Sequence, residues 1–237
     1  MNGASRAIVL LSGGLDSATC LVIARGEADE VFALSFDYGQ RHRVELDRAR
    51  SLAERYGVAA HRTVRLDLPA PGSSALTDLS REVPSNALGA EPIPATYVPA
   101  RNTLFLSHAV AWGEAIGAAD IYIGANALDY SGYPDCRPEF LEAFERMANL
   151  GTKAGVEGAL AFRIHAPLLR LTKGEIVARA AALGLDFALT SSCYDPTPAG
   201  KPCGSCDSCL LRARGFHVAG LRDPLVYDGT SSGVNSS

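Results

Sequence analysis

The feature that most limits what this chain can fold into is a short apolar strand that runs into a glycine turn and then directly into a helix. Residues 7–11 are apolar, residues 12–17 read Ser-Gly-Gly-Leu-Asp-Ser, and an apolar helical pattern covers 18–24. Glycines let backbone N–H groups approach a phosphate, and the first turn of a helix has free N–H donors. The segment therefore predicts an anion site, against the simpler alternative of a tight turn in which Asp and Ser only cap the helix.

Alternation of strand-like and helix-like segments continues along the chain. Glycine follows three of the helical segments, at Gly57, Gly117 and Gly184, where a left-handed residue ends a helix. Strands that alternate with helices predict an α/β fold with a doubly wound parallel sheet. The expected strands are 7–11, 31–36, 62–66, 121–123 and 162–165. The expected helices are 18–24, 44–56, 104–116, 139–149, 173–183 and 210–216.

The composition indicates one main domain that acts on a small molecule. A chain of 237 residues with 47% hydrophobic residues can bury a core by itself. A net charge of −4 argues against a broad basic surface for nucleic acid. Polar residues from Ser12 onward interrupt the first apolar run before a signal peptide could form, and no stretch reaches the roughly 18 apolar residues of a membrane span. A cytoplasmic protein without direct contact to nucleic acid or membrane is expected.

The domain organisation is predicted from changes in composition along the chain. Residues 67–99 are rich in Pro, Gly and Ser and have no sustained period, which indicates a long loop or insertion and a candidate lid. The expected units are a main α/β domain at 1–190, a C-terminal segment at 191–228 packed on it, and a disordered tail at 229–237.

Four of the six cysteines lie in the C-terminal segment with the spacing of a metal site. Four thiolates satisfy tetrahedral Zn²⁺ and leave no position open for water, so one structural ion per chain is expected. Iron–sulfur ligation is the alternative, and disulfides are disfavoured in a reducing cytosol. Cys20 and Cys136 are expected to be buried thiols outside this site. The candidate metal ligands are Cys193, Cys203, Cys206 and Cys209.

The six residues of the glycine turn resemble the SGGxDS signature of the PP-loop ATP pyrophosphatases. The resemblance implies cleavage of ATP to AMP and pyrophosphate, and a five-stranded parallel sheet of the adenine-nucleotide alpha hydrolase type. Asp16 is expected to hold a Mg²⁺ ion that bridges the phosphates. The residues expected at the nucleotide are Leu10, Leu11, Ser12, Gly13, Gly14, Leu15, Asp16 and Ser17.

Two cations are candidates for contact with the leaving pyrophosphate, which gains negative charge as its bond to the α-phosphorus breaks. Lys173 follows the N-cap candidate Thr172 in a segment similar to one that recurs in PP-loop enzymes, and Arg101 lies in Val-Pro-Ala-Arg-Asn-Thr at 98–103. The alternative for each is a solvated charge at a helix end. The expected catalytic residues are Asp16, Arg101 and Lys173.

Further segments resemble the 7-cyano-7-deazaguanine synthase family of this superfamily. They lie at 36–42, 98–103, 129–140 and 192–194 with the cysteine triplet, and the resemblance runs from residue 10 to about 212. It implies an ATP-dependent ligase that converts 7-carboxy-7-deazaguanine and ammonia, through an acyl adenylate and an amide, to the nitrile that precedes queuosine in tRNA. Free ammonia is expected because no room remains for a glutaminase domain. A homodimer is also expected.

The same segments contain the candidate substrate residues. A carboxylate can accept the ring N–H and amino group of a guanine-like face, for which Asp129 and Asp135 are alternatives. Aromatic rings can stack on the bicyclic ring, with ordinary core packing as an equal alternative. Arg137 is a candidate for the substrate carboxylate, and His42 either takes a proton from ammonium or is a structural histidine. The full set is Phe36, Tyr38, His42, Asp129, Tyr130, Tyr133, Asp135 and Arg137.

Three other functions stay open on the sequence alone. A PP-loop tRNA sulfurtransferase also adenylates a carbonyl oxygen, but it would require a basic RNA-binding surface and exposed catalytic thiols, and neither is evident. A paralogue could stop at the amide. A nucleotide sensor with a zinc module, which is not an enzyme, could use the turn and the cysteines, but it would not need Lys173, Arg101 and the aromatic and acidic segment together.

Overall fold

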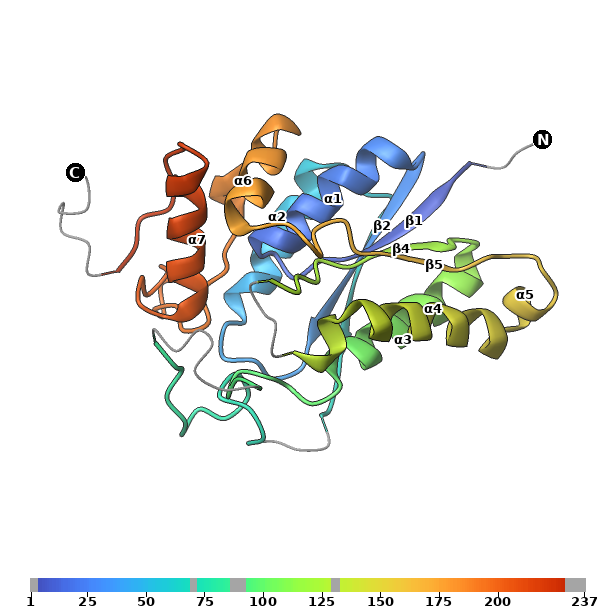
Figure 1. The fold of residues 1–237 in the computed structure, drawn as a ribbon, viewed down its shortest axis with the longest axis horizontal. Coiled ribbons are helices and arrows are strands. Elements are labelled where there is room, and N and C mark those ends of the chain that lie inside the picture. The colour runs from blue at the N-terminus through green and yellow to red at the C-terminus, as the bar shows by residue number, and fades with distance from the viewer. Residues whose placement is uncertain (1–3, 69–71, 86–92, 129–132, 229–237) are drawn as a thin grey trace.

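Five parallel strands form one sheet at the centre of the molecule (Figure 1). The computed structural model describes residues 4–68, 72–85, 93–128 and 133–228. The strand order is β3-β2-β1-β4-β5 and neighbouring strands are parallel, which confirms the predicted five-stranded parallel sheet. The strands are β1 (Arg6–Leu10), β2 (Glu30–Asp37), β3 (Ala60–Arg65), β4 (Asp120–Tyr122) and β5 (Arg163–His165).

Helices cover both faces of the sheet. Figure 1 shows α1, α2 and α6 on one face and α3 and α4 on the other, with α7 packed beside α6. This is the doubly wound arrangement that alternating strands and helices predict. The helices are α1 (Leu15–Glu27), α2 (Val44–Arg55), α3 (Arg101–Ile116), α4 (Pro138–Gly151), α5 (Lys153–Val156), α6 (Lys173–Ala182) and α7 (Asp207–Val218), with short 3-10 turns η1 (Pro134–Cys136) and η2 (Phe187–Leu189).

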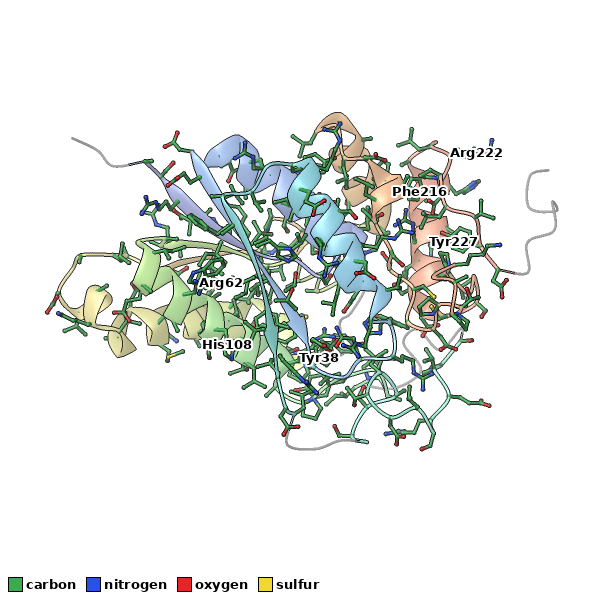
Figure 2. The ribbon with its side chains drawn as sticks, turned by 180° about the vertical axis from the view of Figure 1, so that it is seen from behind. Tyr38, Arg62, His108, Phe216, Arg222 and Tyr227 are labelled. Carbon is green, nitrogen blue, oxygen red and sulfur yellow. The ribbon has the colours of Figure 1, made fainter. Side chains whose placement is uncertain are left out.

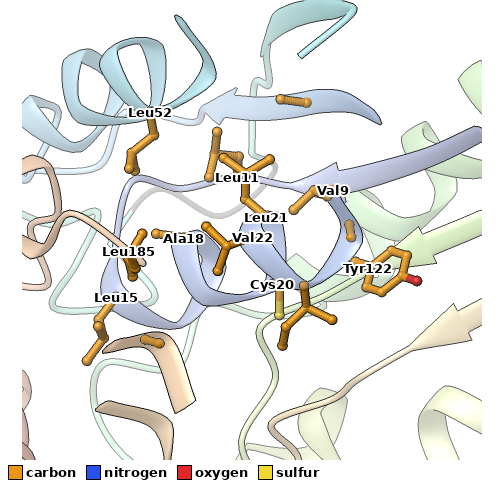
Figure 3. Close-up of a cluster of buried hydrophobic side chains, with 14 of the residues drawn as sticks. Val9, Leu11, Leu15, Ala18, Cys20, Leu21, Val22, Leu52, Tyr122 and Leu185 are labelled. Carbon is orange, nitrogen blue, oxygen red and sulfur yellow. The ribbon is translucent and has the colours of Figure 1, made fainter. Parts of the chain in front are cut away.

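The central strand β1 is buried on both faces. Successive side chains of a strand point to opposite faces of the sheet. Ala7 and Val9 pack with the residues of α1, α2 and α6, in the cluster drawn in Figure 3. Ile8 and Leu10 pack with those of α3 and α4. Because a buried side chain of this size contributes roughly 1.5–3 kcal/mol, both layers hold β1 in place.

The sheet has its topological switch point at β1. β2 and β3 are added on one side of this strand, and β4 and β5 are added on the other. In open parallel sheets, ligands bind beyond the carboxyl ends of the strands at such a point. The glycine turn of residues 12–17 directly follows the carboxyl end of β1, so the topology places it where a ligand is expected.

Helix ends match the sequence signals better than helix starts do. Gly57, Gly117 and Gly184 have φ angles of 59°, 73° and 73°, the left-handed conformation predicted for them. By contrast, α3 begins at Arg101 and α7 at Asp207, each earlier than the periodicity predicts. The first turn of α3 is capped by a side chain from a distant segment, and α7 starts inside the cysteine cluster.

The described residues between 67 and 99 contain no helix or strand. Arg41 holds part of this segment against the turn that follows β2, because its Nη2 donates to the carbonyl oxygens of Asp78 and Arg81 at 2.9 and 2.8 Å. Among the helices in the described parts of the chain, none combines the length and the apolar character needed to cross a membrane.

Candidate active site

Glycine fixes the shape of the turn between β1 and α1. Gly13 has a φ of +89°, and a Cβ at this position would overlap the carbonyl oxygen of Glu45 and lie 2.8 Å from the amide nitrogen of Ala49. Backbone atoms cannot move aside as a flexible side chain can, so only glycine fits. Gly14 is the N-cap residue of α1 and has no side chain that could cap the helix. The N–H groups of the first turn of α1 must therefore find other hydrogen-bond partners.

Serine hydroxyls surround the same turn. The Oγ atoms of Ser12 and Ser17 lie 3.0 Å apart, and the N–H of Gly14 donates to Ser12 Oγ at 3.3 Å. From a distant segment, Ser192 Oγ accepts from the N–H of Leu15 at 3.3 Å. Backbone donors and hydroxyl groups therefore meet at the positive end of the α1 dipole, where an anion is stabilised.

An ion pair between Asp16 and Lys173 lies beside this turn. The Nζ of Lys173 is 2.8 and 2.9 Å from the two carboxylate oxygens of Asp16, and the two side chains are only 9% and 18% exposed. Lys173 is the first residue of α6, whose start is fixed by the predicted N-cap Thr172 in a capping box with Glu175. The fold thus brings together two of the three predicted catalytic residues.

One cavity joins the glycine turn to the carboxyl ends of β2 and β4. Gly13 is not among its lining residues, because it packs against α2 behind the turn. The predicted site residues that line the cavity are Leu10, Leu11, Ser12, Gly14, Leu15, Asp16, Ser17, Phe36, Tyr38, His42, Arg101, Tyr133 and Lys173.

Aromatic rings and one guanidinium form the wall opposite the turn. Phe36 stacks on Phe105 with ring centroids 3.9 Å apart and an angle of 2° between the planes. Tyr38, just beyond the carboxyl end of β2 (Figure 2), accepts a hydrogen bond of 3.4 Å from Nη1 of Arg101. Burial disfavours the charged guanidinium, but Tyr38, Tyr133 and Asp135 together more than offset this, and the pKa of Arg101 is raised. This wall can hold a flat ring beside a fixed positive charge.

Tyr133 and Asp135 occupy different positions although they are close in sequence. Tyr133 lines the cavity, and its hydroxyl lies 2.6 Å from Oγ1 of Thr96. Asp135 is buried outside the lining, and its Oδ2 accepts from the backbone N–H of Asn102 at 3.0 Å. The carboxylate thereby caps the first turn of α3, which supports Arg101.

The remaining predicted substrate residues lie away from the cavity or outside the described part of the chain. Arg137 is exposed and is the N-cap residue of α4. Asp129 and Tyr130 lie outside the described residues. Their roles at a substrate stay predictions.

A buried histidine and a partly buried glutamate meet at the edge of the cavity. His42 Nε2 lies 3.4 Å from Oε2 of Glu45, and Gln40 Nε2 donates to Oε1 of Glu45 at 2.9 Å. Burial lowers the pKa of His42 to about 3, so its imidazole is neutral. Burial raises the pKa of Glu45 to about 8. The sequence gave no signal for Glu45, because a glutamate in the first turn of a helix is common.

The four predicted metal ligands lie together. The Sγ atoms of Cys193, Cys203, Cys206 and Cys209 are all within 4.8 Å of one another, and three of these residues are buried. Cys20 and Cys136 lie elsewhere and are buried, as predicted. Desolvation raises the pKa of Cys136 to about 11, which keeps this thiol protonated and poorly reactive.

The donor set at this cluster fits a tetrahedral thiolate metal. Backbone N–H groups donate to the sulfurs, from Cys203 to Cys193 at 3.2 Å and from Cys206 to Cys203 at 3.4 Å. Such bonds orient ligand sulfurs and stabilise their negative charge. Hydrogen bonds from Cys193 and Cys209 also lower the pKa of the Cys206 thiol. Four crowded sulfurs need a shared cation before all four can be thiolates.

Arg212 joins the cysteine helix to the cavity, and sequence reasoning missed it. Its guanidinium is 2.7 and 3.0 Å from the Asp223 carboxylate, and Nη1 donates to Oγ1 of Thr190 at 2.7 Å. Arg212 also lies over the ring of Phe216, which Figure 2 shows on α7. The sequence did contain one signal for Arg212. It follows Cys209 by three residues, which places both side chains on the same face of the helix.

Comparison with known proteins gives one family. The model of "Queuosine biosynthesis protein QueC" matches residues 6–220. A "7-cyano-7-deazaguanine synthase" of Geobacter sulfurreducens is 60% identical over 94% of this chain and 93% of its own length. A protein of the same name from Pseudomonas syringae pv. tomato is 58% identical over 95% of this chain and 99% of its own length. The NMN synthetase structure from Francisella tularensis aligns with a TM-score of 0.47 at 17% identity, over 93% of this chain and 79% of that one.

Proposed function

This chain belongs to the QueC family of queuosine biosynthesis proteins, and from this premise we propose that it converts 7-carboxy-7-deazaguanine and ammonia to 7-cyano-7-deazaguanine at the expense of ATP. The observation that supports this most directly is the single cavity in which the glycine turn and the Asp16–Lys173 pair face the aromatic wall with Arg101. A nucleotide and a flat acid bound there would have their reacting atoms side by side.

The chemistry requires activation of the acid. A carboxylate resists attack by ammonia because its oxygen is a poor leaving group, whereas an acyl adenylate releases AMP. Attack by ammonia then gives the amide, and a second adenylation at the amide oxygen allows AMP to leave again and the nitrile to form. Each carboxylate oxygen departs on one AMP, and each ATP also yields one pyrophosphate.

The glycine turn is proposed to bind the phosphates. Backbone N–H groups around Gly14 and the hydroxyls of Ser12 and Ser17 supply donors at the start of α1. The Asp16 carboxylate would hold Mg²⁺, which neutralises phosphate charge. The Lys173 ammonium would then leave Asp16 and pair with the pyrophosphate as negative charge develops on this leaving group. Its Nζ already lies beside the turn.

The aromatic wall is proposed to bind the acid. Phe36 and Tyr133 line the part of the cavity beyond the glycine turn, and Arg101 adds a partly buried positive charge that can attract the substrate carboxylate or a phosphate. The roles predicted for Asp129, Tyr130 and Arg137 stay predictions, as do the homodimer and the cytoplasmic location.

The cysteine cluster is proposed to hold one Zn²⁺ with a structural role. Four sulfur ligands would leave no open position for a substrate or water. The ion would tie the 193–206 segment to the start of α7, and the hydroxyl of Ser192, next to Cys193, accepts from the glycine turn.

Mass spectrometry tests the reaction. Purified protein incubated with 7-carboxy-7-deazaguanine, MgATP and ammonium should form the nitrile and release AMP and pyrophosphate. Lys173→Met should lower turnover by about 10²–10³-fold, the cost of losing one preorganised charge at a transition state. The matched control is Lys153→Met, because the Lys153 side chain is 81% exposed on α5. Release of ADP in place of AMP would contradict the adenylation route.

A further inference from the structure

We propose that Glu45 is the catalytic residue that binds the ammonium ion and takes its first proton before nitrogen attacks the adenylate. The inference rests on the proposed function, because it assigns the nitrogen step of that reaction. Ammonium is a small cation that must lose a proton to become a nucleophile, and a carboxylate can both bind this ion and accept its proton.

Glu45 faces the cavity from the first turn of α2. Its side chain is 13% exposed, and Glu45 is among the cavity-lining residues. Gln40 fixes its orientation, because Gln40 Nε2 donates both to Oε1 of Glu45 and to the carbonyl oxygen of Phe36, at 2.9 Å each. The side-chain oxygen Oε1 of Gln40 in turn accepts from the backbone N–H of Tyr38 at 2.8 Å. The carboxylate is therefore held in one place at the cavity edge.

The surroundings of Glu45 lack a strong countercharge. In the described parts of the chain, no Lys or Arg nitrogen lies within 4.0 Å of its oxygens, and the His42 imidazole at 3.4 Å is neutral and supplies no positive charge. Among the described residues, the charged and titratable groups that face it are Arg101 from α3, Tyr38 at the end of β2 and His42 from the turn before α2. A buried carboxylate without a paired cation is costly, and an ammonium ion in the cavity would supply that cation.

His42 is a poor candidate for the same proton. Its imidazole has a pKa of about 3, far below that of ammonium, so it cannot hold a proton taken from this ion. Glu45, with a pKa of about 8, matches the task much better. His42 Nδ1 is buried and has no hydrogen-bond partner among the described residues. A neutral ring that donates through Nε2 toward Glu45 helps to orient the carboxylate. His42 is thus a positioning residue.

The nitrogen step balances with Glu45 as proton acceptor. The Glu45 carboxylate takes one proton from ammonium and becomes a carboxylic acid. The lone pair of ammonia forms the C–N bond at the adenylate carbonyl carbon, and the C–O bond to AMP breaks with its electron pair on the AMP phosphate. The new C–NH₃⁺ group gives its second proton to water, which leaves the amide, and Glu45 returns its own proton to solvent.

Two nucleophiles separate this role from a structural one. Hydroxylamine is already neutral near pH 7, so it attacks an acyl adenylate without a base, and it yields a hydroxamate. Glu45→Gln keeps the size of the side chain but cannot take a proton. It should lower kcat/KM for ammonium by about 10²–10³-fold and change kcat/KM for hydroxylamine less than about threefold. The matched control is Asp47→Asn, in the same first turn of α2 with its side chain 73% exposed, which should change neither.

The pH profile gives a second readout. The defect of Glu45→Gln should be largest near neutral pH and should shrink as the pH approaches the pKa of ammonium, because free ammonia then no longer needs a base. An equal loss with both nucleophiles, or no loss with ammonium, would overturn the proposal. If Glu45→Gln does not fold, Glu45→Asp allows the same comparison, since a displaced carboxylate should still impair ammonium more than hydroxylamine, and equal losses would again overturn it.

Adenylation without any amine distinguishes failure of this inference from failure of the proposed function. Labelled pyrophosphate should exchange into ATP only when 7-carboxy-7-deazaguanine is present. The rate of this exchange should be the same in wild type and Glu45→Gln. Absence of exchange in the wild type would count against the proposed function itself. Normal exchange together with an unchanged ammonium rate in Glu45→Gln would contradict the role proposed for Glu45 and leave the proposed function intact.

Discussion

At the scale of the residue, Gly13 carries a constraint that no other amino acid satisfies. Its φ of +89° is unfavourable for a side chain, and a Cβ would meet backbone atoms of α2. Gly13→Ala should therefore lower the free energy of unfolding by about 2–4 kcal/mol, measured by urea denaturation. Gly14→Ala is the control, because Gly14 has a φ of −77° and a Cβ there would come no closer than 3.4 Å to any neighbour.

Gly14→Ala should cost less than about 1 kcal/mol. Equal losses in the two variants would mean that backbone conformation and the contact with α2 do not decide the requirement for glycine at position 13. The sequence pattern predicts both glycines as parts of one phosphate turn. It cannot separate them, because the difference depends on α2, which packs behind Gly13 only in the folded chain.

Glu45 and His42 illustrate the limit of residue-level prediction. The sequence names His42 as a candidate for a proton from ammonium because an unperturbed histidine titrates near neutral pH. In the fold, burial takes the pKa of His42 down to about 3 and the pKa of Glu45 up to about 8. Burial of each side chain is set by segments that meet in space, so these opposite pKa shifts could not be predicted from the residue types.

At the scale of the element, the cysteine cluster holds the C-terminal segment together. Cys206→Ser should lower the zinc content from one ion per chain to nearly none, because three ligands bind the ion weakly, and it should increase hydrogen exchange in 193–218, because the ion would tie the 193–206 segment to the start of α7. Metal analysis and exchange mass spectrometry measure the two effects. Cys20→Ala, in the buried part of α1, is the control that should keep the metal.

Retention of zinc in Cys206→Ser would contradict the assignment of this ligand. Strong visible absorbance of the wild-type protein as purified would instead indicate the iron–sulfur alternative. The positions of the four cysteines were predictable, because their short spacing brings the sulfurs together almost without regard to the rest of the fold.

Elements were predicted best where the signal is local. The N-cap at Thr172 and the glycines after α2, α3 and α6 depend on neighbouring residues, and they lie where the sequence predicts them. The start of α3 was placed too late because its cap is the Asp135 carboxylate, which reaches it from another part of the chain. A cap of this kind has no signature in the sequence around Arg101.

At the scale of the whole molecule, the order of the strands explains why distant motifs form one site. β1, β2 and β4 end at the same edge of the sheet, so the glycine turn, Tyr38 and the residues after β4 meet there although they are far apart in sequence. The alternation of strands and helices predicts this architecture, because parallel connections leave few other topologies. The contacts between the C-terminal segment and the sheet were not predictable, since they depend on Arg212.

Arg212 should therefore control whether the molecule unfolds as one unit. Its guanidinium joins α7 to Asp223 and to Thr190, with the Arg212 and Asp223 side chains 2% and 10% exposed. The next residue, Ser191, donates its N–H to the carbonyl oxygen of Gly13 at 2.9 Å, which links this network to the glycine turn. Breaking a buried pair leaves one charge uncompensated and costs about 3–5 kcal/mol.

Arg212→Met should thus split thermal unfolding into two transitions, with the C-terminal segment unfolding first, and it should weaken MgATP binding through the loss of support at the glycine turn. Calorimetry and isothermal titration measure these effects. Arg214→Met, an exposed position on the same helix, should change stability by less than about 0.5 kcal/mol. A single transition in Arg212→Met with unchanged nucleotide affinity would contradict this coupling role of Arg212.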